Sequence, residues 1–167
     1  MKLYRLILPL VTMGVLVVDQ VTKIYIDLVM DLHQSVPVIP HLFSITYIRN
    51  KGAAFGFLAD SSFRLPFFIF ISIVAVVVIL FAYRKLRPDQ TLAMVSLAMI
   101  LAGALGNFID RIRLGEVIDF LDVYWKTYHW PAFNIADSAI CVGVFLLAVD
   151  MLREEQRQKS RRHSSGA

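Results

Sequence analysis

The sequence has 167 residues, of which 57% are hydrophobic and 18% charged, whereas a soluble domain usually has about 45–50% apolar and about 25% charged residues. One membrane-embedded domain over residues 1–167 is therefore expected, and membrane orientation explains the net charge of +4 better than a nucleic-acid partner does. The one cysteine, Cys141, excludes an internal disulfide framework and a CxxC metal or redox site.

Four apolar segments predict four transmembrane helices, at about 6–26, 66–83, 92–109 and 135–152. Each approaches the roughly 20 residues that cross about 30 Å of hydrocarbon. Lys2 and Arg5 before the first segment are typical of a signal peptide, but no cleavage pattern of small residues follows, so we expect a retained helix. The third segment is rich in Ala, Gly and Ser, which favours close helix packing.

The two longer connections, at about 27–65 and 110–134, differ in composition from the helices. Residues 35–48 mix β-branched and aromatic side chains with two prolines, which predicts short edge strands. The second connection carries four aromatic residues suited to lipid headgroups (Tyr124, Trp125, Tyr128 and Trp130). The expected fold class is an all-α membrane protein with four transmembrane helices and a small β-rich surface subdomain in the first outer loop.

Charge asymmetry predicts the orientation of these helices. The N-terminus, the short middle loop and the tail from 153 to 167 hold 10 of the 17 Lys and Arg residues. By the positive-inside rule both termini are cytoplasmic and the two long loops face outward. The tail is polar and basic, and disorder is expected at its end.

Polar residues gather at the outer ends of the predicted helices, where ionisable groups are costly and indicate function. Asp137 lies 16 residues before Arg153, which corresponds to about 24 Å of helix and leaves it within the outer leaflet of a core of about 30 Å. Asp19 lies at a similar depth. Structural explanations exist for each acid alone.

Asp19 and Lys23 have the i,i+4 spacing of a helical ion pair. Asp110 and Arg111 can form a helix-end pair, and Asp137 can complement the dipole of its helix. Asp119 can be an ordinary loop residue.

The convergence of Asp119 and Asp137 at one membrane face favours chemistry over these structural roles. Two carboxyl groups within hydrogen-bonding reach share a proton and titrate as a coupled pair. One member can then activate a water while the other polarises a scissile carbonyl, and this needs no metal or cofactor. No HExxH or GxSxG motif is present. A proton-coupled transporter and a non-catalytic scaffold are the alternatives.

Five ordered sequence blocks carry a resemblance to a known family. They are 19–23 (DQVTK), 49–56 (RNKGAAFG), 103–111 (GALGNFIDR), 117–120 (VIDF) and 133–138 (FNIADS). With these blocks the chain resembles the lipoprotein signal peptidases (signal peptidase II), which are aspartyl proteases of the bacterial cytoplasmic membrane. The resemblance extends from about residue 4 to residue 153.

This resemblance implies an activity, a site and partners. Asp119 and Asp137 would be the catalytic dyad, with supporting roles for seven residues: Asp19, Lys23, Asn50, Gly52, Asn107, Arg111 and Asn134. The implied reaction removes the signal peptide from a prolipoprotein, just before its diacylglyceryl-modified cysteine. Membrane lipids, a monomeric state and inhibition by globomycin are expected as well. The active site would lie at the outer leaflet of the inner membrane.

Overall fold

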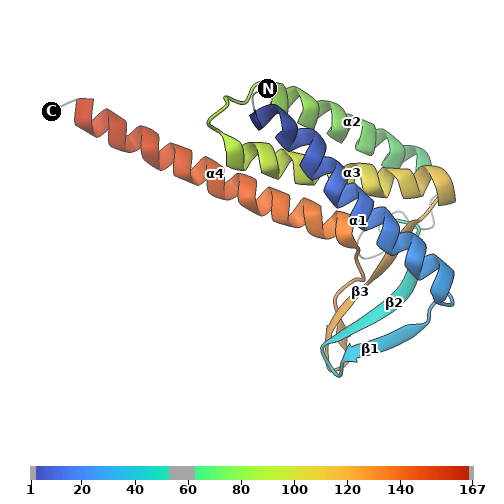
Figure 1. The fold of residues 1–167 in the computed structure, drawn as a ribbon. Coiled ribbons are helices and arrows are strands. Elements are labelled where there is room, and N and C mark those ends of the chain that lie inside the picture. Colours follow the sequence, from blue (N-terminus) through green and yellow to red (C-terminus); the bar gives the residue numbers. More distant parts are fainter. Residues whose placement is uncertain (1–2, 53–62, 166–167) are drawn as a thin grey trace.

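The computed structural model describes residues 3–52 and 63–165, and within them helices form a bundle with a small sheet at one end (Figure 1). The helices are η1 (Leu3–Leu6), α1 (Ile7–Val29), α2 (Arg64–Arg84), α3 (Thr91–Leu114) and α4 (Ile135–Ser165). The strands are β1 (Ser35–Ile39), β2 (Phe43–Asn50), β3 (Val117–Trp125) and β4 (Tyr128–His129). Residues 53–56 of one sequence block lie outside the described residues.

The helix bundle is built around α3. This helix packs against α1, α2 and α4, and its apolar window is the most buried of the four. Gly103 lies directly against the backbone oxygen of Ala136 in α4, where a side chain would collide. The Ala, Gly and Ser composition thus allows the close approach that was expected. Within the residues that the structure describes, four helices are long and apolar enough to cross a membrane, as the sequence predicts.

Two helices are longer than their apolar segments indicate. Helix α3 continues to Leu114 and is capped by Gly115, whose φ of 73° suits the left-handed cap position. The residues at 110–114 are therefore helical and do not belong to a loop. Helix α4 continues to Ser165, so the disorder expected in the tail is wrong over the described residues. Glu, Gln, Lys and Arg are good helix formers, and the i,i+4 ion pair of Glu155 with Lys159 (2.6 Å) supports this last part.

The sheet is antiparallel with strand order β1-β2-β3-β4. The prediction of a β-rich subdomain is confirmed, but its confinement to the first outer loop is wrong, because β3 and β4 come from the second. The register pairs Asn50 with Val117 and Phe43 with Val123. Residues 117–125 are rich in β-branched and aromatic side chains, which suit a strand.

A small apolar core fixes the sheet to the bundle. Ile26 of α1, Tyr47 of β2 and two residues of β3, Ile118 and Phe120, are buried together. The sheet lies at the end of the bundle opposite both termini (Figure 1). The first half of β3 is therefore held against the C-terminal end of α1, next to the start of α4.

Candidate active site

A cavity of about 510 Å³ opens where the sheet meets the end of α3 and the start of α4. Five predicted site residues line it: Asn50, Gly52, Arg111, Asp119 and Asp137. The rest of its wall comes from the segment before α4 and from the first turns of that helix (Trp130, Pro131, Ala132, Phe133, Ser138 and Cys141). Two carboxyl groups thus face a space with a largely apolar wall.

Asp119 is a strand residue held by two amide donors. It pairs with Ile48 across the β2–β3 ladder and is 3% exposed. Asn134 Nδ2 donates to its Oδ1 at 2.7 Å, and Asn50 Nδ2 donates to its Oδ2 at 2.9 Å. Burial of the carboxyl, together with the negative charge of Asp137, raises the pKa of Asp119 to about 7. This side chain can therefore hold a proton near neutral pH.

Asp137 lies in the first turn of α4, where it forms a reciprocal pair with Asn134. The Asp137 backbone N–H donates to Asn134 Oδ1 at 3.0 Å, and the Asn134 backbone N–H donates to Asp137 Oδ2 at 3.2 Å. This is the geometry of a capping box. Its other oxygen, Oδ1, accepts from Asn107 Nδ2 at 2.7 Å. The helix-capping role and a role in the cavity are thus compatible.

The 17 residues between the two aspartates fold back on themselves. The hairpin of β3 and β4 reverses the chain, and Phe133 then bridges to Leu121 of β3. Its N–H donates to the Leu121 oxygen at 3.1 Å, and its own oxygen accepts from the Leu121 N–H at 2.8 Å. Asn134 therefore starts α4 directly beside Asp119, and it contacts both carboxyl groups.

Asn107 of α3 is oriented by Lys23 of α1. Lys23 Nζ donates to Asn107 Oδ1 at 3.0 Å, and Asn134 Nδ2 donates to the same oxygen at 3.2 Å. An ammonium group has donors only, so the oxygen of this amide must face Lys23. The amide nitrogen consequently faces Asp137.

Arg111 and Gly52 close the cavity on the other side. Arg111 Nη2 donates to the backbone oxygen of Gly52 and Nη1 to the backbone oxygen of Asn107, both at 3.4 Å. Its guanidinium lies 4.7 Å from the ring centre of Phe68, within cation–π distance. The Gly52 N–H donates to Asn50 Oδ1 at 2.9 Å, which turns the Asn50 amide nitrogen toward the strand carboxyl.

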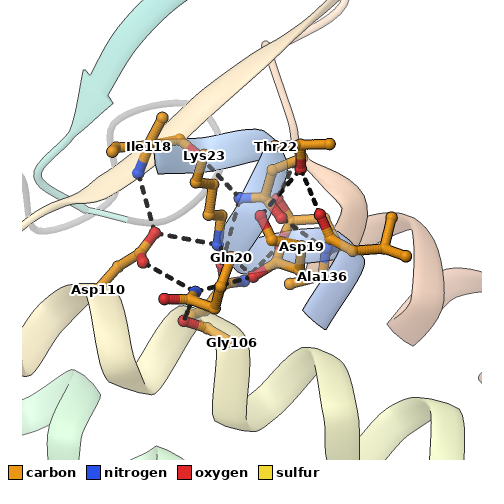
Figure 2. Close-up of polar contacts among 12 residues, drawn as sticks. Asp19, Gln20, Thr22, Lys23, Gly106, Asp110, Ile118 and Ala136 are labelled. Atoms are coloured by element: carbon orange, nitrogen blue, oxygen red, sulfur yellow. Dashed lines mark hydrogen bonds and ion pairs between the residues drawn. The ribbon is translucent and has the colours of Figure 1, made fainter. Parts of the chain in front are cut away.

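Asp19 and Lys23 do not line the cavity but lie in a buried ion cluster (Figure 2). Lys23 Nζ is 3.0 Å from Asp19 Oδ2 and 3.0 Å from Asp110 Oδ2. All three side chains are at most 1% exposed. The predicted pair of Asp19 with Lys23 is therefore present. The expected pair of Asp110 with Arg111 is wrong, because neighbouring helix residues face apart and Asp110 reaches α1.

All nine predicted site residues converge on this region, and two features were missed. Asp110 was treated as structural, although its i,i+3 spacing from Asn107 puts both on one helix face. Cys141 was not among the predicted site residues, but it is exposed and lines the cavity. Its i,i+4 spacing from Asp137 is the signal that could have placed it there.

The chemistry available to this arrangement is that of an acid pair. Both carboxyl groups reach one cavity, and each of their oxygens accepts a hydrogen bond from a fixed amide. Such a pair can hold one proton and take another from a water. Among the described residues, no group of three or more His, Cys, Asp and Glu side chains could hold a metal ion.

Comparison with known proteins gives close matches over nearly the whole chain. The sequence model of the family described as signal peptidase (SPase) II matches residues 11–153. The lipoprotein signal peptidase of Geobacter sulfurreducens is 72% identical over 148 residues, which cover 89% of this chain and 92% of that protein. The lipoprotein signal peptidase of Geobacter metallireducens is 64% identical over 155 residues, or 93% and 95% of the two chains.

Two solved structures, each described as a bacterial membrane enzyme, have the same fold. The first is 39% identical, with a TM-score of 0.81, and the match covers 89% of this chain and 88% of the other. The second is 36% identical, with a TM-score of 0.75, and covers 86% and 90%.

Proposed function

Because the chain belongs to the signal peptidase II family, whose members process prolipoproteins, we propose that it is an aspartic endopeptidase with Asp119 and Asp137 as its catalytic dyad. It would cleave before the diacylglyceryl-modified cysteine of a prolipoprotein and release the signal peptide. The observation that carries this proposal is that the two carboxyl groups line one cavity and are both contacted by Asn134.

In the proposed mechanism the two acids differ in protonation. Asp119, with its pKa raised to about 7, holds the shared proton and donates a hydrogen bond to the scissile carbonyl oxygen. Asp137 is ionised, as suits the first turn of a helix, and takes a proton from the attacking water. When the tetrahedral intermediate collapses, Asp137 gives the proton that it took from water to the leaving amide nitrogen, the C–N bond breaks and the carbonyl re-forms. The pair then returns to its single-proton state.

The surroundings of the dyad fit a lipid-anchored substrate. A diacylglyceryl-modified cysteine presents its scissile bond at the outer surface of the bilayer. The cavity lies at the sheet end of the bundle, opposite both termini, and charge asymmetry predicts cytoplasmic termini (Figure 1). We therefore propose that the sheet lies on the outer face of the inner membrane. The apolar wall around Phe133 would contact the substrate.

Three neighbouring side chains would support this reaction. Asn50 and Asn134 hold the two oxygens of Asp119, and Asn107 holds one oxygen of Asp137. Arg111 and Gly52 line the same cavity and would bind the substrate backbone. The proposed enzyme works as a monomer without a cofactor and is inhibited by globomycin.

Replacing each dyad member with asparagine tests the proposal. Asp119→Asn and Asp137→Asn keep the side-chain shape but remove the titratable proton, so kcat should fall by about 10² to 10⁴. The assay measures release of the signal peptide from a diacylglyceryl-modified prolipoprotein in detergent. Asp122→Asn is the matched control, because Asp122 lies on the same strand but pairs with His129. Wild-type cleavage by either dyad variant would refute the mechanism.

A further inference from the structure

The two acids of the buried ion cluster each accept a hydrogen bond from the backbone N–H of the residue that directly precedes a dyad aspartate. Asp19 Oδ1 accepts from the N–H of Ala136 at 2.8 Å, and Asp110 Oδ2 accepts from the N–H of Ile118 at 3.2 Å. Ala136 directly precedes Asp137, and Ile118 directly precedes Asp119. Each cluster acid thus holds the backbone N–H of the residue directly before one member of the dyad.

The same two acids are tied to each other by two donors (Figure 2). Lys23 Nζ lies 3.0 Å from a carboxyl oxygen of each acid. Gln20 Nε2 donates to Asp19 Oδ2 and to Asp110 Oδ1, both at 3.1 Å, and to the Gly106 oxygen at 3.3 Å. A side chain at Gly106 would collide with the Asp19 carboxylate, so glycine leaves the space that the cluster occupies.

The burial of this cluster is costly for stability alone. Taking three charged groups out of water carries a desolvation penalty that apolar residues of the same size avoid. Neither these three side chains nor that of Gln20 lines the cavity, so none of the four is placed to touch substrate. Asp19 and Asp110 instead reach the backbone N–H groups directly before the two dyad residues. Lys23 also donates to Asn107, whose amide donates to Asp137.

We propose that Asp19, Gln20, Lys23 and Asp110 form a clamp that sets the separation of the two dyad carboxyl groups. The clamp connects α1 and α3 with β3 and α4. It therefore holds β3 and α4 in place, which the chain itself joins only through the β3–β4 hairpin and the segment after it. Its members are positioning residues, and their role rests on the proposed function. A displacement of about 1 Å at a catalytic group costs roughly 10²-fold in rate, which gives the clamp its importance.

Two clamp variants separate positioning from folding. Lys23→Met removes the central charge, and we expect kcat per folded enzyme to fall about 100-fold with KM within about twofold. Gln20→Met removes one bridge without leaving a buried charge unpaired, so it should fold normally and lower kcat by about three- to tenfold. Folded enzyme is quantified by size-exclusion chromatography and thermal melting, and kcat is divided by that amount.

Two substitutions at Asp110 of similar size differ in kcat per folded enzyme only if Asp110 positions the dyad, and not if its role is purely structural. Asp110→Asn keeps an oxygen that can accept from the Ile118 N–H, whereas Asp110→Leu has a similar size and no acceptor. The clamp predicts that the asparagine variant retains at least about ten times more kcat per folded enzyme. Asp27→Asn is the control, because it removes an ion pair with Arg49 from α1, the helix of Asp19 and Lys23, and has no bond to the backbone beside the dyad.

The outcomes distinguish the clamp from the dyad itself. Wild-type kcat in Gln20→Met and equal kcat in the two Asp110 variants would overturn the clamp, even if Lys23→Met fails to fold. Losses confined to KM or to the folded fraction would also overturn it. In the same assay, an inactive Asp119→Asn beside fully active clamp variants leaves the proposed function standing, whereas an active Asp119→Asn refutes that function.

Discussion

At the scale of single residues, three asparagines control the two carboxyl groups. Asn50, Asn107 and Asn134 each have an amide whose oxygen is already committed to another donor, so each nitrogen is directed at an aspartate. An amide does this without adding charge. A positively charged donor in the same place would lower the pKa of the pair, and the pair would lose the proton that the proposed mechanism requires.

The pH dependence of cleavage should report the proton on Asp119. Its pKa is raised to about 7, chiefly by burial and next by the charge of Asp137. Because the reaction needs one proton on the pair, kcat/KM should fall about tenfold for each pH unit above that value. Steady-state rates measured across neutral and alkaline pH test this. A flat profile over about pH 6 to 9 would contradict it, since kcat/KM follows the free enzyme.

The raised pKa of Asp119 also predicts how the stability of the fold changes with pH, which is an independent check. Folding raises the pKa of Asp119 from its ordinary value of 3.8 to about 7. The stability that this proton contributes to the fold is therefore complete below the ordinary pKa and is lost as pH rises through about 7. Asp119→Asn cannot ionise. Its melting temperature should therefore exceed that of the wild type by more at about pH 8 than at about pH 5. The opposite trend would mean that burial does not raise this pKa.

At the scale of elements, close contact of α3 with α4 brings the two halves of the site together. Gly143 of α4 faces the Ser96 oxygen of α3, and an added side chain would lie 2.8 Å from it. Gly103 of α3 faces the backbone of α4 near its start. Small residues therefore occur on both sides of this interface, where an added carbon would meet a backbone oxygen of the other helix, which cannot move aside, as well as an isoleucine side chain.

Alanine substitutions at these glycines should loosen the helix pair. Gly103→Ala and Gly143→Ala are expected to lower the melting temperature, because overpacking typically costs about 1–3 kcal/mol. Gly14→Ala in α1 is the matched control, since nothing lies within 4 Å of an added carbon there. That variant should be neutral or slightly stabilising, as alanine favours a helix by about 0.5–1 kcal/mol over glycine. Equal melting temperatures for all three variants would rule out close packing at this interface.

At the scale of the whole molecule, one end carries the sheet and the cavity, and the other carries both termini (Figure 1). The β3–β4 hairpin exposes large aromatic side chains, with Trp125 66% and Tyr128 80% exposed. Such residues favour the headgroup region. The acids of the site all lie at this one end, whereas a proton-coupled transporter needs ionisable groups along the whole membrane depth.

The orientation can be tested by labelling single cysteines in intact cells. In a Cys141→Ala background, Pro40→Cys lies in the exposed turn between β1 and β2, and Gln156→Cys lies in the exposed end of α4. A membrane-impermeant maleimide should label the first in intact cells and the second only after permeabilisation, because the basic end is retained inside. The reverse pattern would refute the proposed outer location of the sheet.

The sequence by itself determined the features that depend on local composition. Apolar length gives the four helices, and the residue types at 35–48 give strands, because each follows from the chemistry of one segment. The motif blocks indicated nine candidate site residues. The ends of α3 and α4 were set too short, because apolar length marks where lipid contact ends, whereas helical hydrogen bonding continues through polar residues such as Arg111.

Only the tertiary structure decided which residues meet. Asp110 has a local partner available in Arg111, yet it pairs with Lys23, 87 residues away in the chain, because helix packing places α1 against its face. The composition of β3 suits a strand, but its pairing with β2 could be known only from the fold, since strand pairing is non-local. The contacts of Asp19 with Ala136 and of Asp110 with Ile118 depend on both kinds of packing together. No pattern within one segment encodes them, which is why the clamp was not predicted from the sequence.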